Sequence, residues 1–106
     1  MWLFIWKMIE VNKNTLKDLT SENERVFVYF YTEWDGYSKM MFPNLTKLQS
    51  EIDVPIVICN IDYNYDLGTE FKVRGLPTFG LVYNGEIIRT DSSVQTIDYI
   101  KEFIFE

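Results

Sequence analysis

The chain has 106 residues, is 47% hydrophobic and 17% aromatic, and carries a formal net charge of −6. This length supports one domain with a hydrophobic core and is too short for two. Nucleic-acid binding and binding to anionic membranes both need clustered Lys and Arg, and the ten basic residues here are scattered, so we expect neither. A single cysteine excludes an intramolecular disulfide, and we therefore expect a cytoplasmic protein.

The chain begins with the apolar stretch MWLFIWK, which we treat as an N-terminal extension of residues 1–7 ahead of a single domain over residues 8–106. Its apolar run is shorter than a signal-peptide core and far below the roughly 20 residues that span a bilayer. Two roles remain open. The extension either adds an edge or a cover to the domain, or it binds a partner or a second copy of the chain through its exposed aromatic residues.

Strands and helices alternate along the first half of the domain. Residues 8–11 predict a short strand, and residues 14–19 predict one or two helical turns that end in a polar segment. Residues 26–31 form a continuous β-branched and aromatic run, which is typical of a strand covered on both faces. Residues 39–52 have the apolar spacing of a helix, and Pro43 should kink it because proline removes a backbone donor.

The second half contains a strand, a helix, two strands and a helix, at residues 55–61, 65–72, 78–83, 86–90 and 96–105. Asn84-Gly85 predicts a tight hairpin, because both residues tolerate positive φ, and Thr96 is the expected N-cap of the last helix. The order β-α-β-α-β-α-β-β-α predicts an α/β fold, with a mixed central sheet flanked by helices on both faces.

Several short motifs occur in one order and at one spacing: Glu33-Trp34-x-Gly36-x-x-Lys39-Met40, Pro43, Asn60-Ile61-Asp62, Val73-Arg74-Gly75-Leu76-Pro77-Thr78 and Asn84-Gly85-Glu86. With these motifs, residues 26–104 resemble thioredoxin in register and without obvious gaps. The resemblance implies a thioredoxin fold and a cis peptide bond between Leu76 and Pro77. It also implies that Trp34, Gly36 and Pro77 meet at one surface groove.

The departures from the family concern its chemistry. The family motif is Trp-Cys-Gly-Pro-Cys, and Asp35 and Ser38 stand at its two cysteine positions. Dithiol exchange needs a thiolate that attacks sulfur and a second thiol that releases the product, and a carboxylate and a hydroxyl supply neither. The family also carries a buried Asp and a nearby Lys that help to move the proton, and Tyr29 and Ile58 replace them. We therefore predict a redox-inactive protein.

Asp35 is expected to cap the helix that follows it, because its carboxylate accepts hydrogen bonds from unpaired backbone donors. Acid–base chemistry or metal binding at Asp35 is disfavoured. The chain has no His, and no nearby Asp or Glu has a spacing in the sequence that would force its carboxylate close to Asp35. We expect no cofactor and no metal. Cys59 lies in an apolar run and is expected to behave as a small buried hydrophobic residue with a raised pKa.

The favoured function is a non-catalytic module that holds a protein partner or an extended peptide. In the family, the residue before the cis-proline, here Leu76, pairs its backbone with an extended client. Tyr37 replaces a proline and offers an aromatic anchor, and Ser93 replaces a glycine of the groove. The predicted partner-binding residues are Trp34, Asp35, Gly36, Tyr37, Ser38, Gly75, Leu76, Pro77 and Ser93. The alternative is a thiol–disulfide oxidoreductase that acts through Cys59 or through a partner's thiols.

Overall fold

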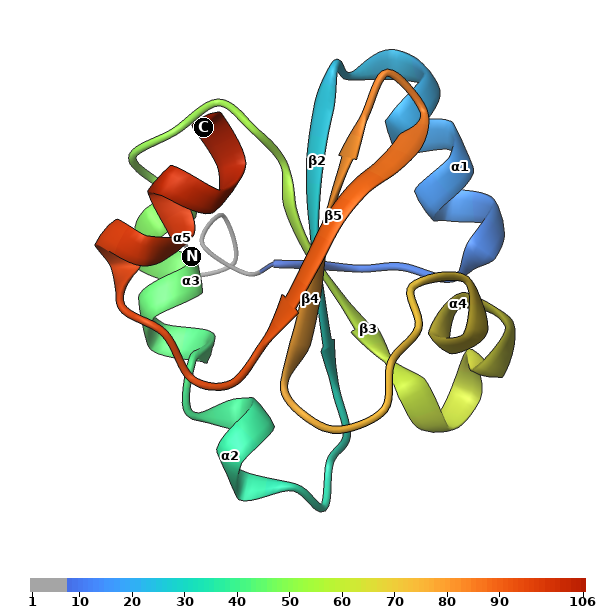
Figure 1. Ribbon diagram of the computed structural model, residues 1–106, viewed down its shortest axis with the longest axis vertical. Helices are drawn as coiled ribbons and strands as arrows, with labels where there is room; N and C mark the ends of the chain where they lie inside the picture. The colour runs from blue at the N-terminus through green and yellow to red at the C-terminus, as the bar shows by residue number, and fades with distance from the viewer. Residues whose placement is uncertain (1–7) are drawn as a thin grey trace, which may run out of the picture.

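The computed structural model describes residues 8–106, and the predictions made for residues 1–7 lie outside this part (Figure 1). Its centre is a five-stranded sheet in the order β1-β3-β2-β4-β5. The strands are β1 (Ile9–Glu10), β2 (Arg25–Tyr31), β3 (Ile56–Asn60), β4 (Thr78–Tyr83) and β5 (Glu86–Ser92). Strands β1 and β2 run parallel to β3, whereas β2 with β4 and β4 with β5 are antiparallel, so the predicted mixed sheet is confirmed.

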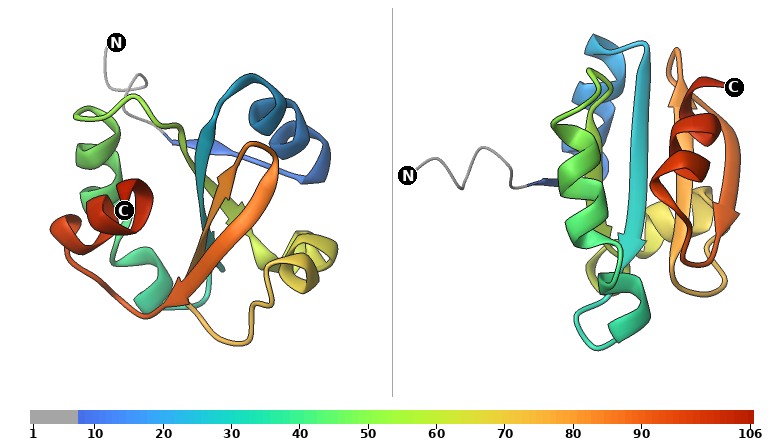
Figure 2. Two further views of the ribbon diagram at one scale, coloured as in Figure 1. Left: turned by 45° about the horizontal axis from the view of Figure 1, so that its top comes forward. Right: turned by 90° about the vertical axis from the view of Figure 1, so that its left-hand side faces the viewer.

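Helices cover both faces of this sheet, as the sequence predicted. They are α1 (Lys13–Glu22), α2 (Gly36–Lys39), α3 (Phe42–Gln49), the 3-10 turn η2 (Ile61–Tyr63), α4 (Tyr65–Glu70) and α5 (Ile97–Phe105). Helices α3 and α5 lie on one side of the sheet and α1 and α4 on the other (Figures 1 and 2). Within residues 8–106, no helix is both long enough and apolar enough to cross a membrane.

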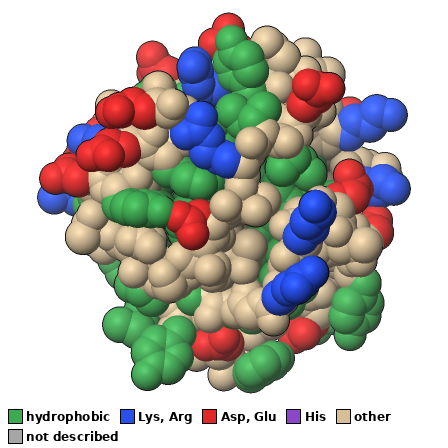
Figure 3. Space-filling model, viewed as in Figure 1, with side chains coloured by type: hydrophobic (Ala, Val, Ile, Leu, Met, Phe, Trp, Pro, Cys, Tyr) green, Lys and Arg blue, Asp and Glu red, His purple; other side chains and the backbone are tan. Residues whose placement is uncertain are grey.

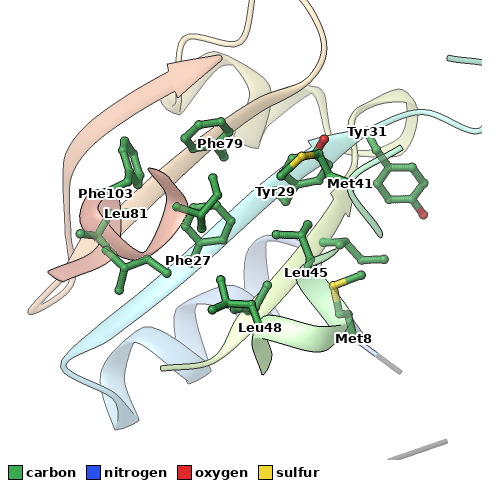
Figure 4. Close-up of a cluster of buried hydrophobic side chains, with 14 residues drawn as sticks. Met8, Phe27, Tyr29, Tyr31, Met41, Leu45, Leu48, Phe79, Leu81 and Phe103 are labelled. Carbon is green, nitrogen blue, oxygen red and sulfur yellow. The ribbon is translucent and has the colours of Figure 1, made fainter. Parts of the chain in front are cut away.

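Strand β2 is the middle of the sheet, which explains its continuous apolar run. Alternate side chains of a strand point to opposite faces, and both faces are covered here. Phe27, Tyr29 and Tyr31 join the core beneath α3 and α5, where Phe27 and Phe79 pack with ring centroids 5.5 Å apart (Figure 4). Val28 and its neighbours on the other face join the core beneath α1 and α4.

The second core depends on a glycine in the middle of β4. A Cβ atom at Gly80 would lie 2.6 Å from Cδ2 of the Phe71 ring, so no larger residue fits without displacing that ring. Phe71 in turn packs on Phe30 with ring centroids 5.0 Å apart. The absent side chain therefore lets the residue that ends α4 pack directly on the sheet.

Several local boundaries differ from the sequence prediction, and three of them have a clear local cause. The expected kinked helix over residues 39–52 is two helices, α2 and α3, because Pro43 lies in the first turn of α3, where its missing N–H costs nothing. Helix α1 runs on to Glu22, and the Thr20 and Ser21 hydroxyls donate to carbonyls three residues back. Strand β5 continues two residues further, to Ser92, since it stays paired with β4.

Two predicted turns and caps are confirmed. Asn84 and Gly85 have φ of 51° and 84°, the left-handed conformation expected of the hairpin between β4 and β5. The Thr96 side chain accepts a hydrogen bond from the Tyr99 N–H at 3.1 Å and begins α5. The segment between β5 and α5 lies at the same end of the sheet as α2 (Figures 1 and 2).

Candidate functional site

The candidate site lies where β2 ends and α2 begins. The segment that leads into β4 and the segment after β5 reach the same end of the sheet (Figures 1 and 2). The peptide bond between Leu76 and Pro77, in the first of these segments, is cis. All nine predicted partner-binding residues belong to these three segments, so the topology gathers them at one end of the molecule.

Asp35 stands at the N-cap of α2. Its backbone is extended, with φ of −98° and ψ of 105°, and its Oδ1 accepts hydrogen bonds from the backbone N–H groups of Tyr37 at 2.9 Å and Ser38 at 3.4 Å. These are the donors that a helix start leaves without a partner, so the predicted capping role is confirmed. The carboxylate thus occupies the nucleophile position of the family motif and is engaged with its own helix.

Ser38 is fully buried, unlike the residues around it. Its hydroxyl donates to the Asp35 carbonyl at 2.9 Å and accepts from the Thr32 N–H at 3.3 Å, which ties α2 to the end of β2. A side chain enclosed in this way supports the shape of the site and offers no surface to a partner. Sequence position alone placed it with the contact residues, because burial at this point depends on how α2 folds back on the sheet.

The two positions that move the proton in the family have become part of the core. Tyr29 is fully buried, is the strand partner of Ile58, and stacks on Phe79 with an interplanar angle of 10°. Burial, followed by the charge of Asp35, raises the pKa of the Tyr29 phenol. The phenol hydroxyl has no hydrogen-bond partner among the described residues. Tyr29 therefore stays neutral at physiological pH and fills space where the family keeps an acid.

Cys59 is fully enclosed in β3, on the face covered by α1 and α4. Burial, with smaller effects from the charges of Glu10 and Asp66, raises the pKa of its thiol to about 12 from an ordinary value of 9.0. Almost no thiolate is present at neutral pH, and the sulfur is not accessible to a disulfide. The prediction of a buried thiol with a raised pKa is confirmed.

Trp34 and Tyr37 are the exposed aromatic residues at the start of α2. Their side chains are 75% and 69% exposed, and the Trp34 indole N–H donates to Oδ2 of Asp62 at 3.0 Å. Asp62 thus holds the ring of Trp34 while leaving most of its surface open. Gly36, between the two aromatic residues, is exposed and faces open space. Asp62 belongs to the Asn60-Ile61-Asp62 motif. Its contact with Trp34 joins residues 28 positions apart, so no local sequence pattern could have predicted this contact.

The other predicted residues line an open groove of about 480 Å³. Its lining includes Gly75, Leu76, Pro77 and Ser93, together with Lys72, Arg74, Thr78, Thr90, Asp91 and Ser92. Ser93 has a φ of 76°, and its backbone N–H donates to the Pro77 carbonyl at 3.0 Å, which closes one wall. Trp34, Asp35, Gly36 and Tyr37 are not among the lining residues, so the structure separates the predicted site into a groove and an adjoining exposed segment.

The two cations of the groove, Lys72 and Arg74, are not among the residues predicted from the sequence. Arg74 belongs to the Val73-Arg74-Gly75-Leu76-Pro77-Thr78 motif, whereas Lys72 precedes the motif and has a positive φ of 58°. Within residues 8–106, no three side chains of the Cys, Asp and Glu type converge as metal ligands would. Chemically, the arrangement presents backbone groups, charged side chains and exposed aromatic rings.

Comparison with known proteins decides the family, since the thioredoxin family model matches residues 7–106. The chain belongs to the thioredoxin family. The solved structure of a mutant thioredoxin from Halobacterium salinarum NRC-1 superposes with a TM-score of 0.87, at 30% identity over 93% of this chain and 88% of that one. The thioredoxin fold is thereby confirmed.

Curated relatives include Thioredoxin-3, mitochondrial, of Saccharomyces cerevisiae, which is 38% identical over 73% of this thioredoxin-family chain and 61% of its own length. Thioredoxin of Rickettsia typhi is 32% identical over 86% of this chain and 98% of its own. The chain thus spans less than two thirds of the yeast relative. The names of two fungal relatives place them in mitochondria, and the cytoplasmic location of this chain stays a prediction.

Proposed function

We propose that this thioredoxin-family chain is a redox-inactive module that binds an extended segment of a protein partner. The main support for the proposal is what Asp35 and Ser38 do at the two positions where the family has cysteine. Asp35 caps α2 through its carboxylate, and Ser38 is buried with its hydroxyl bonded on both sides. Both side chains are engaged in holding the helix, so neither is available to react with sulfur.

A role for Cys59 in place of the missing pair does not fit its surroundings. Attack on a disulfide needs an accessible thiolate, and this thiol is fully buried with a pKa raised to about 12. An oxidoreductase working through Cys59 would first have to open β3, which is paired on both sides by β1 and β2. The geometry therefore favours binding over thiol exchange.

The groove supplies the means of binding. Among residues 8–106, the backbone N–H and C=O of Leu76 have no hydrogen-bond partner, while its neighbours are bonded through the Gly75 and Pro77 carbonyls. Leu76 is half-buried, and its backbone lies beside the groove. A free donor and a free acceptor on one residue suit strand-like pairing with an extended segment, which needs no cysteine.

The redox half of the proposal is tested with a disulfide-reduction assay in the presence of dithiothreitol. We expect the wild-type chain to match the no-protein control. The double variant Asp35→Cys, Ser38→Cys restores two thiols at the family positions and serves as the matched positive control. Turnover by the wild-type chain clearly above the control, and lost in Cys59→Ala, would establish the oxidoreductase alternative and overturn the proposal.

The binding half is tested by NMR with short synthetic peptides of varied sequence. We expect the backbone amide signals of Gly75, Leu76 and Ser93 to shift most, because the peptide backbone pairs beside them. The double variant Trp34→Ala, Tyr37→Ala should bind more weakly, since aromatic anchors contribute strongly to interfaces. Peptide-induced shifts confined to other parts of the sheet, or none at all, would refute a binding role for this groove.

A further inference from the structure

Four aromatic side chains of the described residues stand out strongly into solvent: Trp34, Tyr37, Tyr63 and Tyr65 are 75%, 69%, 83% and 76% exposed. We call the first three the aromatic rim. Trp34 and Tyr37 belong to the start of α2, and Tyr63 directly follows Asp62, whose carboxylate accepts from the Trp34 indole N–H at 3.0 Å. Such strongly exposed aromatic residues are unusual on a surface without a partner.

Acidic side chains are interspersed with this rim. Glu33 and Asp35 flank Trp34 in the chain, and Asp62 precedes Tyr63. Hydrophobic and acidic side chains alternate along the lower edge of the molecule in Figure 3, where Figure 1 places α2. The cation of this segment, Lys39, is bound by Glu33 at 3.2 Å. Asp62 uses only Oδ2 for the indole, so its Oδ1 is open to a second donor.

The groove on the other side carries charge of the opposite sign. Lys72 and Arg74 line it together with one carboxylate, that of Asp91, which accepts a hydrogen bond from the Tyr99 hydroxyl. Neither cation forms an ion pair with any of the described residues. With two cations and one carboxylate the groove lining is net positive, so a cationic side chain of a partner is favoured at the rim over the groove. This asymmetry fixes how a charged segment would lie across the end of the sheet.

We propose that the aromatic rim binds an arginine side chain of the partner segment whose backbone lies in the Leu76 groove. The inference rests on the proposed binding function and adds the chemistry of the partner. A guanidinium group stacks on the faces of Trp and Tyr, and its fork of N–H donors pairs with a carboxylate. Trp34 and the open oxygen of Asp62 offer that combination at one place, because the other oxygen of the same carboxylate accepts from the Trp34 indole N–H.

The test uses three sets of short synthetic peptides with identical apolar residues at alternating positions. A single position near one end of each peptide holds arginine in the first set, glutamine in the second and glutamate in the third, and the remaining positions are uncharged. Affinity is measured by titration calorimetry at low and high salt. We expect the arginine set to bind about tenfold tighter than the glutamine set at low salt, and the glutamate set to bind most weakly. High salt should reduce the preference for arginine.

Variants of rim residues test whether the preference for the arginine peptides depends on the aromatic rim. Asp62→Asn keeps an acceptor for the Trp34 indole and removes the charge, and Tyr63→Ala removes a ring that is 83% exposed. Each should lower the preference for arginine. The matched controls Glu86→Gln and Ile88→Ala make the same kinds of change on the exposed part of β5 and should leave the preference unchanged.

Equal binding of the arginine and glutamine sets would overturn the inference and leave the binding function standing. The same holds if the β5 controls lose the preference as much as the rim variants do. If no set binds at all, the proposed binding function fails together with the inference. A preference for arginine that is lost only in the rim variants supports it.

Discussion

Replacing Asp35 by alanine removes the cap of α2 and should destabilise the fold measurably. The carboxylate accepts one short hydrogen bond, at 2.9 Å from the Tyr37 N–H, and one long one, at 3.4 Å from the Ser38 N–H. Loss of an N-cap costs about 0.5–2 kcal/mol. Because α2 has only four residues and the cap holds two of its N–H groups, we expect a loss toward the upper end of that range, about 1.5–2 kcal/mol.

The loss is measured by urea unfolding followed by circular dichroism. For a domain of this size, each kcal/mol also lowers Tm by roughly 4–8 °C, so a thermal melt provides an independent check. Asp35→Asn is the matched control, since it keeps the acceptor oxygen and removes only the charge, and it should cost less than about 1 kcal/mol. An unchanged melt for Asp35→Ala would refute the capping role. Equal losses in the two variants would assign the effect to charge.

Two further predictions concern the core. Raising the pH through about 9 to 12 should lower the free energy of unfolding by up to about 1.4 kcal/mol per pH unit from Cys59, because the unfolded thiol ionises while the buried one, with its pKa raised to about 12, stays protonated. Cys59→Ala should lose stability less steeply over this range, and parallel slopes in urea unfolding would contradict the assignment. Gly80→Ala should cost about 1–3 kcal/mol, because its Cβ would lie 2.6 Å from the Phe71 ring. Gly75→Ala, where the Cβ meets open space, should change stability by less than about 1 kcal/mol in the same assay, and equal losses would exclude the ring contact as the cause.

The fold was accessible from the sequence to a large extent because its signals are local. The unbroken apolar run of β2, the Asn84-Gly85 turn and the Thr96 cap each depend on residues close together in the chain. Helix boundaries were less accessible. Pro43 disfavours a helix interior and suits a helix start, and only the packing of α3 against the sheet selected the second outcome.

The candidate site divides in the same way. The sequence by itself determined that the chain lacks a cysteine pair, that Asp35 precedes a helix, and that Leu76-Pro77 follows the family pattern, because these are statements about residue types and near neighbours. Tertiary structure alone decided that Ser38 is buried, that Ser93 closes the groove against Pro77, and that Asp62 holds Trp34. Those contacts join segments that are distant in the chain or depend on how a helix folds back. Their formation is set by the packing of the whole sheet and not by any local pattern.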